Sequence, residues 1–260
     1  MEPWPAGVGR EIHAALDSTN AEALRRAATG AAGPVWILAQ TQTAGRARRG
    51  RAWQMQQGNF AASLLMRPEG PPAAAALRSF AAALALDDAL VGAGVPRARL
   101  TLKWPNDVLL DGRKLAGILL ETGGPVGGPL ALVVGIGVNL VAAPDAGDLE
   151  PGAVDPVALG PATGIVLSPE ALLDRIAPAF ARWEARLQSG GFDALRTPWL
   201  ARAARLGEPI VARLSGRALS GRFETVDATG ALVLVTDTGR VSLPAAEIHF
   251  AGEAGYAARH

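Results

Sequence analysis

The chain has 260 residues, of which 49% are hydrophobic, and a net charge of +1. This apolar content excludes a globally disordered chain, and the charge balance argues against a polybasic, chromatin-type protein. Because the chain has no cysteine, a disulfide scaffold, a thiolate zinc site and a cysteine nucleophile are all excluded.

The sequence carries no signal for secretion or for a membrane. The first residues, MEPWPAGVGREIH, lack the basic region and the apolar region of a secretory signal. The most apolar stretch, residues 73–90, contains Arg78, Asp87 and Asp88 and does not predict a transmembrane helix. We therefore expect a soluble, cytoplasmic protein without membrane contact.

The first half of the chain is predicted to alternate strands with two helices. Residues 17–30 form a helix that begins with a capping box of Thr19 and Glu22 and ends at Gly30. A longer, alanine-rich helix is expected over residues 71–94. Strands are predicted over residues 35–40, 59–66, 100–104, 108–110, 114–121 and 130–140.

Most of these strands follow one another through turns rather than through helices. Asp111-Gly112 is a strong signal for a type I′ hairpin turn. Consecutive hairpins predict an α+β fold, with a mixed, largely antiparallel sheet and helices on one face. Gly135 and Gly137 interrupt the last of these strands, which indicates a bulge or a ligand that approaches the backbone closely.

The next part of the chain is predicted to be a loop and two helices. Residues 141–167 are rich in Pro, Gly and Ala and are expected to form a loop. Ser168 is the expected N-cap of a helix that reaches residue 189. A second helix is expected over residues 192–206, with an interruption near Pro198.

After Gly207 the pattern changes to short strands separated by turns. These strands are predicted over residues 209–214, 219–226, 232–235 and 240–243. Their even spacing predicts a small barrel of SH3-like size. The sequence thus predicts two domains, a catalytic domain over residues 1–206 and a barrel over residues 207–260.

Lysine is almost absent from the chain. Of the 25 basic residues, 23 are arginine, and the two lysines are Lys103 and Lys114. In such a sequence, a lysine indicates a position that needs a compact ammonium group instead of a planar guanidinium. Two residues are a small sample, so chance is the competing explanation.

A loop over residues 41–58 contains the most unusual segment, GRARRGR at residues 45–51. Its glycines allow tight turns, and its arginines bind carboxylate and phosphate groups in a bidentate manner. The segment therefore indicates an anionic substrate. A solvated basic loop or a contact to nucleic acid is an equally good interpretation of this segment alone.

Both lysines are expected near one end of the sheet. Lys103 ends a strand in the segment KWPND, and Lys114 begins the returning strand of the next hairpin. Ammonium groups there would stabilise charge on a transferring phosphoryl group, and Asp107 offers an oxygen ligand for Mg²⁺. Taken alone, Asn106-Asp107 is more typical of a plain turn.

Taken together, the motifs resemble the biotin–protein ligase family over about residues 12–250. They occur in a fixed order: Ser18-Thr19-Asn20, Gln42, the run GRARRGR followed by Trp53, KWPND at 103–107, RKLAGIL at 113–119, Glu121, and GIGVN at 135–139. The resemblance implies a class II synthetase-like, biotin–lipoate ligase catalytic fold. In this family, biotin and MgATP form biotinyl-5′-adenylate and pyrophosphate. The biotinyl group then passes to a lysine of the biotin carboxyl carrier domain of a carboxylase such as acetyl-CoA carboxylase.

The resemblance also implies residue roles. The catalytic residues would be Lys103, Arg48, Lys114 and Asp107, with Asp107 as the metal ligand. The biotin site would comprise Ser18, Thr19, Asn20, Gln42, Gly45, Arg46, Ala47, Arg48, Lys103 and Gly117. The ATP site would comprise Arg46, Arg49, Arg51, Trp53, Asn106 and Asn139.

Two features depart from the pattern of some family members. Ala47 stands where the family's loop usually has glycine. Alanine tolerates positive φ poorly, so we expect the loop to follow a slightly different backbone path or to be less mobile. The biotin-pocket motif begins at Ser18, so a winged-helix domain is not expected before it. We therefore expect ligase activity without DNA binding or transcriptional repression. The resemblance leaves open a homodimer, the particular acceptor and the order of substrate binding.

Two other functions compete with biotin ligation. A lipoate or octanoate ligase or transferase would share the catalytic fold, but its pocket would be more apolar and would not need the arginine loop. An RNA-binding module is the alternative from another class. Against it, the aromatic residues are not interleaved with the arginines as stacking platforms.

Overall fold

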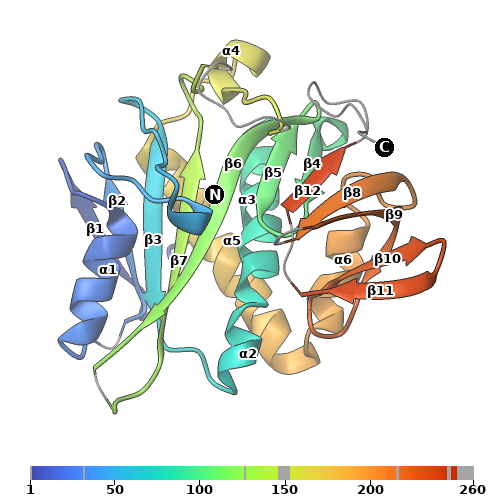
Figure 1. Cartoon of the computed structure of the whole chain (residues 1–260). Helices are drawn as coiled ribbons and strands as arrows, with labels where there is room; N and C mark the ends of the chain where they lie inside the picture. The colour runs from blue at the N-terminus through green and yellow to red at the C-terminus, as the bar shows by residue number, and fades with distance from the viewer. Residues whose placement is uncertain are drawn as a thin grey trace.

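The computed structural model describes residues 2–31, 33–125, 127–145, 153–214, 217–244 and 247–250. These residues form two β-sheets with their associated helices (Figure 1). The larger sheet has seven strands in the order β1-β2-β3-β7-β6-β5-β4, and the smaller has five in the order β11-β10-β9-β8-β12. Of the helices in these ranges, none has the length and apolar composition needed to cross a membrane.

The seven-stranded sheet is mixed and largely antiparallel, as predicted. Its strands are β1 (Gly9–His13), β2 (Val35–Ala39), β3 (Phe60–Met66), β4 (Leu100–Lys103), β5 (Asp107–Leu110), β6 (Arg113–Gly123) and β7 (Ala131–Val138). Only β1 and β2 are paired in parallel within this sheet. Strand β1 was not predicted, because this edge strand is short and partly charged and has no apolar run. Asp111 and Gly112 both have positive φ, of 52° and 75°, which confirms the type I′ hairpin between β5 and β6.

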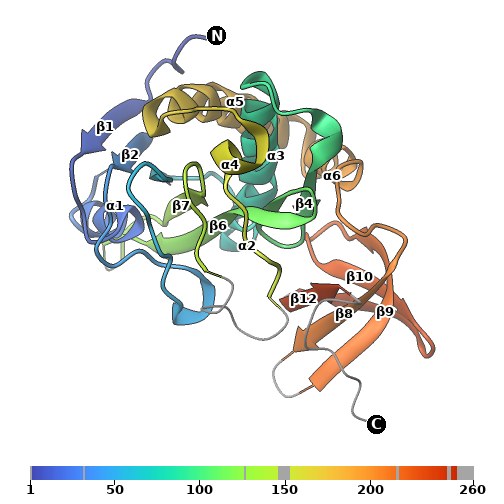
Figure 2. The same ribbon diagram turned by 90° about the horizontal axis from the view of Figure 1, so that it is seen from above.

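Helices lie on both faces of this sheet (Figure 2). The helices are α1 (Thr19–Ala28), α2 (Pro72–Ala75), α3 (Arg78–Gly92), α4 (Leu159–Thr163), α5 (Pro169–Gly190) and α6 (Asp193–Leu200). The helical layer of α3 and α5 covers one face, and a buried ion pair of 2.7 Å joins Arg78 of α3 to Glu184 of α5. Of the helices in the described residues, α1 covers the opposite face, over a small cluster that includes Ala23, Ala27 and Val133.

Several helix boundaries differ from the expected ones. The helix expected over residues 71–94 is divided into α2 and α3, and the break brings Leu77 close to Gly230 of the C-terminal sheet. The N-cap of α1 is Ser18 and not Thr19, since the Ser18 hydroxyl accepts a hydrogen bond from Ala21 N. The structure bears out the expected end of α1, where Gly30 has a φ of 90°.

The other two long helices differ in how well they were predicted. The prediction for α5 is confirmed, because Ser168 Oγ accepts a hydrogen bond from Ala171 N at 3.1 Å. Helix α6 is shorter than predicted and ends at Leu200. The short helix α4 was missed within the expected loop, because Gly160 and Pro161 are poor helix formers.

The C-terminal sheet is antiparallel and lies beside the β4 edge of the larger sheet (Figure 1). Its strands are β8 (Pro209–Leu214), β9 (Arg217–Val226), β10 (Leu232–Thr236), β11 (Gly239–Leu243) and β12 (Glu247–Phe250). The sequence predicted the first four. It missed β12, because four residues beside His249 carry too little periodicity to predict a strand.

Candidate active site

A cavity of about 490 Å³ opens on the α1 face of the seven-stranded sheet. Its walls come from the start of α1, the arginine loop, the β4–β5 turn, residues 153–156 and β12. It brings together all but one of the predicted site residues: Ser18, Thr19, Asn20, Gln42, Arg46, Ala47, Arg48, Arg49, Arg51, Trp53, Lys103, Asn106, Asp107, Lys114, Gly117 and Asn139. Gly45 does not line the cavity but lies under the loop, since a Cβ atom there would meet Trp53 O at 2.5 Å.

One row of paired residues crosses the cavity floor. Ala61 pairs with Gly137, Gly137 with Gly117, Gly117 with Asp107, and Asp107 with Lys103, on five neighbouring strands. Directly paired residues share a face of a sheet. The row therefore sets three small residues beside a carboxylate and an ammonium group.

The first wall is a neutral, hydrogen-bonded cluster at the start of α1. Gln42 Oε1 accepts hydrogen bonds from Thr19 N at 2.8 Å and from Thr19 Oγ1 at 3.1 Å. The Ser63 hydroxyl lies 2.7 Å from Thr19 Oγ1 and also contacts Asn20 Oδ1. Thr19 and Asn20 are buried, with exposed fractions of 3% and 4%. The cluster therefore presents fixed donors and acceptors without a net charge.

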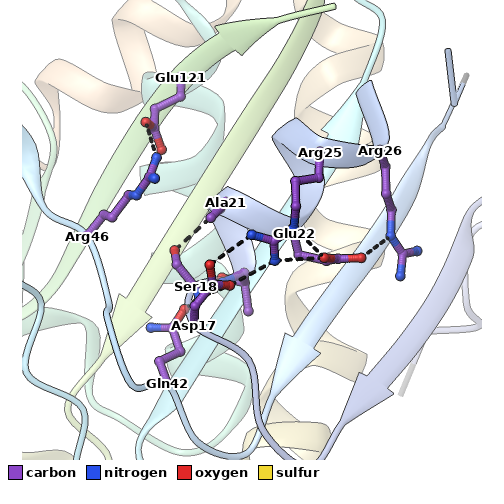
Figure 3. Close-up of polar contacts among 10 residues, drawn as sticks. Asp17, Ser18, Ala21, Glu22, Arg25, Arg26, Gln42, Arg46 and Glu121 are labelled. Atoms are coloured by element: carbon purple, nitrogen blue, oxygen red, sulfur yellow. Dashed lines mark hydrogen bonds and ion pairs between the residues drawn. The ribbon is translucent and has the colours of Figure 1, made fainter. Parts of the chain in front are cut away.

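An ion pair between Asp17, which precedes α1, and Arg25 of α1 lies beside this wall (Figure 3). The Asp17 carboxylate accepts two hydrogen bonds of 2.8 Å from the Arg25 guanidinium and one of 2.7 Å from Ser18 N. The Arg25 guanidinium holds the pKa of Asp17 well below its ordinary value. The backbone oxygen of Asp17 also accepts a hydrogen bond from Ala44 N at 2.8 Å, which joins the wall to the arginine loop.

Asn20 links the wall to the arginine loop through Glu121. Asn20 Nδ2 donates to Glu121 Oε2 at 2.8 Å. On the other side of this carboxylate, Arg46 Nη1 lies 3.3 Å from Glu121 Oε1, a contact drawn in Figure 3. A Cβ atom on Gly135 would lie 2.1 Å from Asn20 Oδ1. Gly135 is therefore needed because a side chain of the protein itself, not a ligand, occupies the space over this strand.

The arginine loop has a defined path over the cavity. Arg46 and Ala52 form an antiparallel bridge, and Arg48 Nη1 donates to Asn106 Oδ1 at 3.0 Å. The positive φ values of the GRARRGR segment fall at Arg49, with 59°, and at Gly50, with 73°. Ala47 has φ of −125° and ψ of 178°, an extended conformation that any residue adopts. The alanine therefore causes no backbone strain here.

Trp53 ends the loop against the glycine row. A Cβ atom added to Gly137 would lie 2.5 Å from the Trp53 ring, whereas one added to Gly117 would lie 3.4 Å from it. As at Gly135, the chain itself fills the space over Gly137. Trp53 Nε1 and Asn139 Oδ1 are buried and have no hydrogen-bond partner in the described part of the chain, so they are available to a ligand.

The cationic end of the cavity lies at β4, β5 and β6. Lys103 is 8% exposed, and Lys114 Nζ forms an ion pair of 2.9 Å with Asp107 Oδ1. Backbone hydrogen bonds of 2.7 Å and 2.9 Å join Lys114 to Asp155 and Val157. The start of β6 and the facing wall are thus held together around the Lys114 side chain.

The C-terminal sheet contributes residues that the sequence analysis missed. Ile248 and His249 of β12 line the cavity, and both are nearly buried. The wall formed by Ala153, Val154 and Pro156 was missed as well, because these residues lie in a segment interpreted only as a loop. Because β12 was not predicted, no signal in the sequence pointed to His249.

The fold and this site define a class of protein. A model of the biotin/lipoate A/B protein ligase family matches residues 14–139, and a model of the biotin protein ligase C-terminal domain matches residues 206–250. A biotin protein ligase from Aquifex aeolicus, solved in complex with biotin and ATP, has the same fold, with a TM-score of 0.76 at 22% identity over 92% of this chain and 97% of that one. This is the architecture of protein ligases for biotin and lipoate.

Sequence similarity narrows the class to one family. A biotin--[acetyl-CoA-carboxylase] ligase from Paracoccus denitrificans is 57% identical over 92% of this chain and 99% of its own length. A ligase of the same description from Mycobacterium tuberculosis is 35% identical over 86% of this chain and 82% of its own length. The chain therefore belongs to the biotin–protein ligase family.

Proposed function

We propose that this enzyme joins biotin to ATP, forming biotinyl-5′-adenylate and pyrophosphate, and then transfers biotin to a lysine of a carboxylase. The observation that carries the proposal is the polarity of the cavity. A neutral hydrogen-bonded wall at Thr19, Asn20 and Gln42 faces a cationic end at Lys103 and Lys114. Biotin has the matching halves, a neutral ureido ring and a carboxylate.

The neutral wall would hold the ureido ring. The ring offers one carbonyl oxygen and two N–H groups, which match hydroxyl and amide side chains. The hydrogen bonds among Thr19, Gln42 and Ser63 fix these groups before the ligand binds, and the ordering cost of binding falls accordingly. A lipoate site would not need such a wall, because the dithiolane ring forms few hydrogen bonds.

The cationic end would join the two anionic substrates. In the first step, a biotin carboxylate oxygen attacks the α-phosphorus of ATP, and pyrophosphate leaves with the electrons of the broken P–O bond. Arg48, Lys103 and Lys114 would reduce the repulsion between the carboxylate and the triphosphate and stabilise the negative charge that shifts onto the leaving group. The orphaned donor Trp53 Nε1 and acceptor Asn139 Oδ1 are available to the nucleotide.

The donor set of the cavity fits a magnesium ion bound mainly by phosphates. Asp107 is the one carboxylate among the described lining residues, and no cluster of three metal-ligating side chains occurs in the described ranges. Mg²⁺ ordinarily keeps several waters and takes one or two carboxylates plus substrate phosphates. When bound, it would neutralise phosphate charge, and Asp107 would be its protein ligand.

The second step transfers biotin to the acceptor. The ε-amine of the acceptor lysine attacks the acyl carbon of the adenylate, and AMP leaves. Until then, the mixed anhydride needs protection from water, and the loop from Arg46 to Trp53 covers the cavity where the anhydride would lie. We take the acceptor to be a biotin carboxyl carrier domain.

The decisive experiment uses the whole chain with biotin, ATP, Mg²⁺ and an isolated biotin carboxyl carrier domain. Mass spectrometry should find one biotinyl group on the carrier domain only when ATP is present. Isotopic pyrophosphate exchange should depend on biotin and not on lipoate. Exchange with lipoate alone would overturn the assignment to biotin, and the absence of any exchange would overturn the proposed function.

A further inference from the structure

We propose that the C-terminal sheet takes part in adenylate formation by fixing Lys103 through a contact between Trp104 and Gly230. This inference rests on the proposed function, which assigns Lys103 to the junction of carboxylate and phosphate. Trp104 and Gly230 would be positioning residues, since they act on the reaction through Lys103.

The contact joins the two sheets directly beside Lys103. Trp104 follows Lys103 in the chain and is 4% exposed, and its Nε1 donates a hydrogen bond to Gly230 O at 3.0 Å. Gly230 lies in the turn between β9 and β10 of the C-terminal sheet. A movement of that turn would therefore reach the residue next to Lys103.

Gly230 fits this contact because it has no side chain. Its φ is 87°, and a Cβ atom there would lie 3.1 Å from both Leu77 and Phe80, at the break before α3 and on α3 itself. Any other residue would be strained at this φ and would push the turn away from the larger sheet. The glycine thus allows the turn to dock closely enough for the hydrogen bond.

The docking turn is itself rigid. Asp227 Oδ1 accepts hydrogen bonds from Thr229 N at 2.8 Å and from Ala231 N at 3.1 Å. Asp227 Oδ2 accepts one from Ser242 Oγ of β11, and Asp227 O accepts one from Gly230 N at 3.0 Å. The Gly230 carbonyl is therefore presented to Trp104 at a fixed position.

Lys103 is held from its other side by the connection between the two sheets. Leu102 N donates to Arg202 O, and Ala204 N donates to Leu102 O, both at 2.8 Å. The Arg202 guanidinium lies 3.3 Å from the fully buried Asp87. The neighbours of Lys103 on both sides are thus bound to the C-terminal part of the chain.

This arrangement matters because a lysine side chain has four rotatable bonds and does not position itself. An ammonium group that moves by about 1 Å at a reaction centre loses much of its effect on the rate. The residues of the neutral wall lie on α1, the arginine loop and β3, and none of them takes part in this contact. Loosening the contact should therefore lower the rate of adenylate formation without weakening biotin binding.

Three variants test the inference. Trp104→Phe keeps a ring and removes the Nε1 donor, and Gly230→Ala adds the crowded Cβ atom. Gly239→Ala is the matched control, because Gly239, at the start of β11 beside the β10–β11 turn, also has positive φ but has nothing within 4 Å of its Cβ position. Each variant is measured by pyrophosphate exchange, by calorimetric biotin affinity without ATP, and by thermal unfolding.

We expect Trp104→Phe and Gly230→Ala each to lower kcat for exchange by about fivefold or more, with biotin affinity within about twofold of the parent. The double variant should lose little more than either single one, because both remove the same contact. A Trp104→Phe enzyme with parental kcat would overturn the inference, as would a Gly230→Ala enzyme equal to Gly239→Ala. If Gly230→Ala does not fold, Trp104→Phe decides. The parent enzyme is the control for the proposed function: if it shows biotin-dependent exchange, the proposed function stands, and the variants then test this inference alone.

Discussion

The indole ring of Trp53 occupies the space that a side chain on Gly137 would need, because a Cβ atom there would lie 2.5 Å from the ring. The two residues are 84 positions apart in the chain. The conformation of the arginine loop therefore depends on the absence of a side chain on β7. A loop that contacts the sheet in this way has a defined position over the cavity floor.

Gly137→Ala should weaken ATP-dependent activity much more than Gly117→Ala. The first substitution forces the Trp53 ring to move, whereas the Cβ atom of the second would lie at an ordinary contact distance of 3.4 Å. We expect KM for ATP to rise by about tenfold in Gly137→Ala and by less than about threefold in Gly117→Ala. Equal effects of the two substitutions in steady-state kinetics would contradict the role given to Trp53.

Ala47→Gly should leave the activity within about twofold of the parent, because the backbone at this position is extended and glycine relieves no strain there.

Arg48→Ala, the next position, should release free adenylate into solution. Chromatography of the reaction without acceptor measures the released adenylate. If the Arg48→Ala enzyme retains its adenylate as tightly as the parent, Arg48 does not hold the adenylate in the cavity.

Lys103→Arg should impair adenylate formation although it keeps the charge. Lys103 is 8% exposed in the cavity, and a guanidinium is larger and planar, so its charge would be displaced from the position of the ammonium group. We expect pyrophosphate exchange to fall by about tenfold or more. Lys114→Arg is the comparison, since the Lys114 side chain is 33% exposed and has more room. Near-parental exchange by Lys103→Arg would refute the prediction.

Asp227→Asn should destabilise the protein at neutral pH and not in strong acid. Burial alone would raise the pKa of the Asp227 carboxyl, but hydrogen bonds from Ser242, Thr229 and Ala231 outweigh it and lower the pKa from 3.8 to about 2. The stabilisation is therefore complete above pH 3.8 and is lost as the pH falls towards 2.

We expect the parent to exceed the Asp227→Asn variant by about 1 kcal/mol in free energy of unfolding at pH 7, after allowance for solvent screening. Denaturant titrations followed by circular dichroism at several pH values measure the difference. Other carboxylates titrate in the same range, but they are common to both proteins and cancel. A difference that stays constant from pH 7 to pH 2 would contradict this account.

The sequence predicted the elements whose signals are local. Ser168 before a proline predicts the start of α5, and Asp111-Gly112 predicts the β5–β6 hairpin, because caps and tight turns depend on a few neighbouring residues. Strands β1 and β12 gave no such signal. They are stabilised by pairing with β2 and β8 in space, which a short sequence segment does not specify.

The candidate site could be predicted as a set of residues but not as an arrangement. The motifs identified Asn20, Trp53 and Gly137, yet only the folded chain reveals that the first and second lie over glycines of one strand. The part of the C-terminal sheet in the cavity was invisible for the same reason. His249 lines the cavity because the two sheets pack side by side, and the periodicity of a sequence does not predict how two sheets pack.

The alternation of side chains along β7 has a consequence for how this enzyme tolerates change. Its even-numbered residues, Leu132, Val134, Ile136 and Val138, belong to the main core with α3 and α5. On the other face, Ala131 and Val133 pack in the small cluster with α1, whereas Gly135 and Gly137 lie in the cavity floor. The decrease in side-chain size along this face of β7 therefore makes room for Asn20 and Trp53, which line the cavity. Enlarging residues 135 and 137 would displace these two side chains while the main core behind the strand keeps its packing, so the two faces of β7 would respond to selection separately.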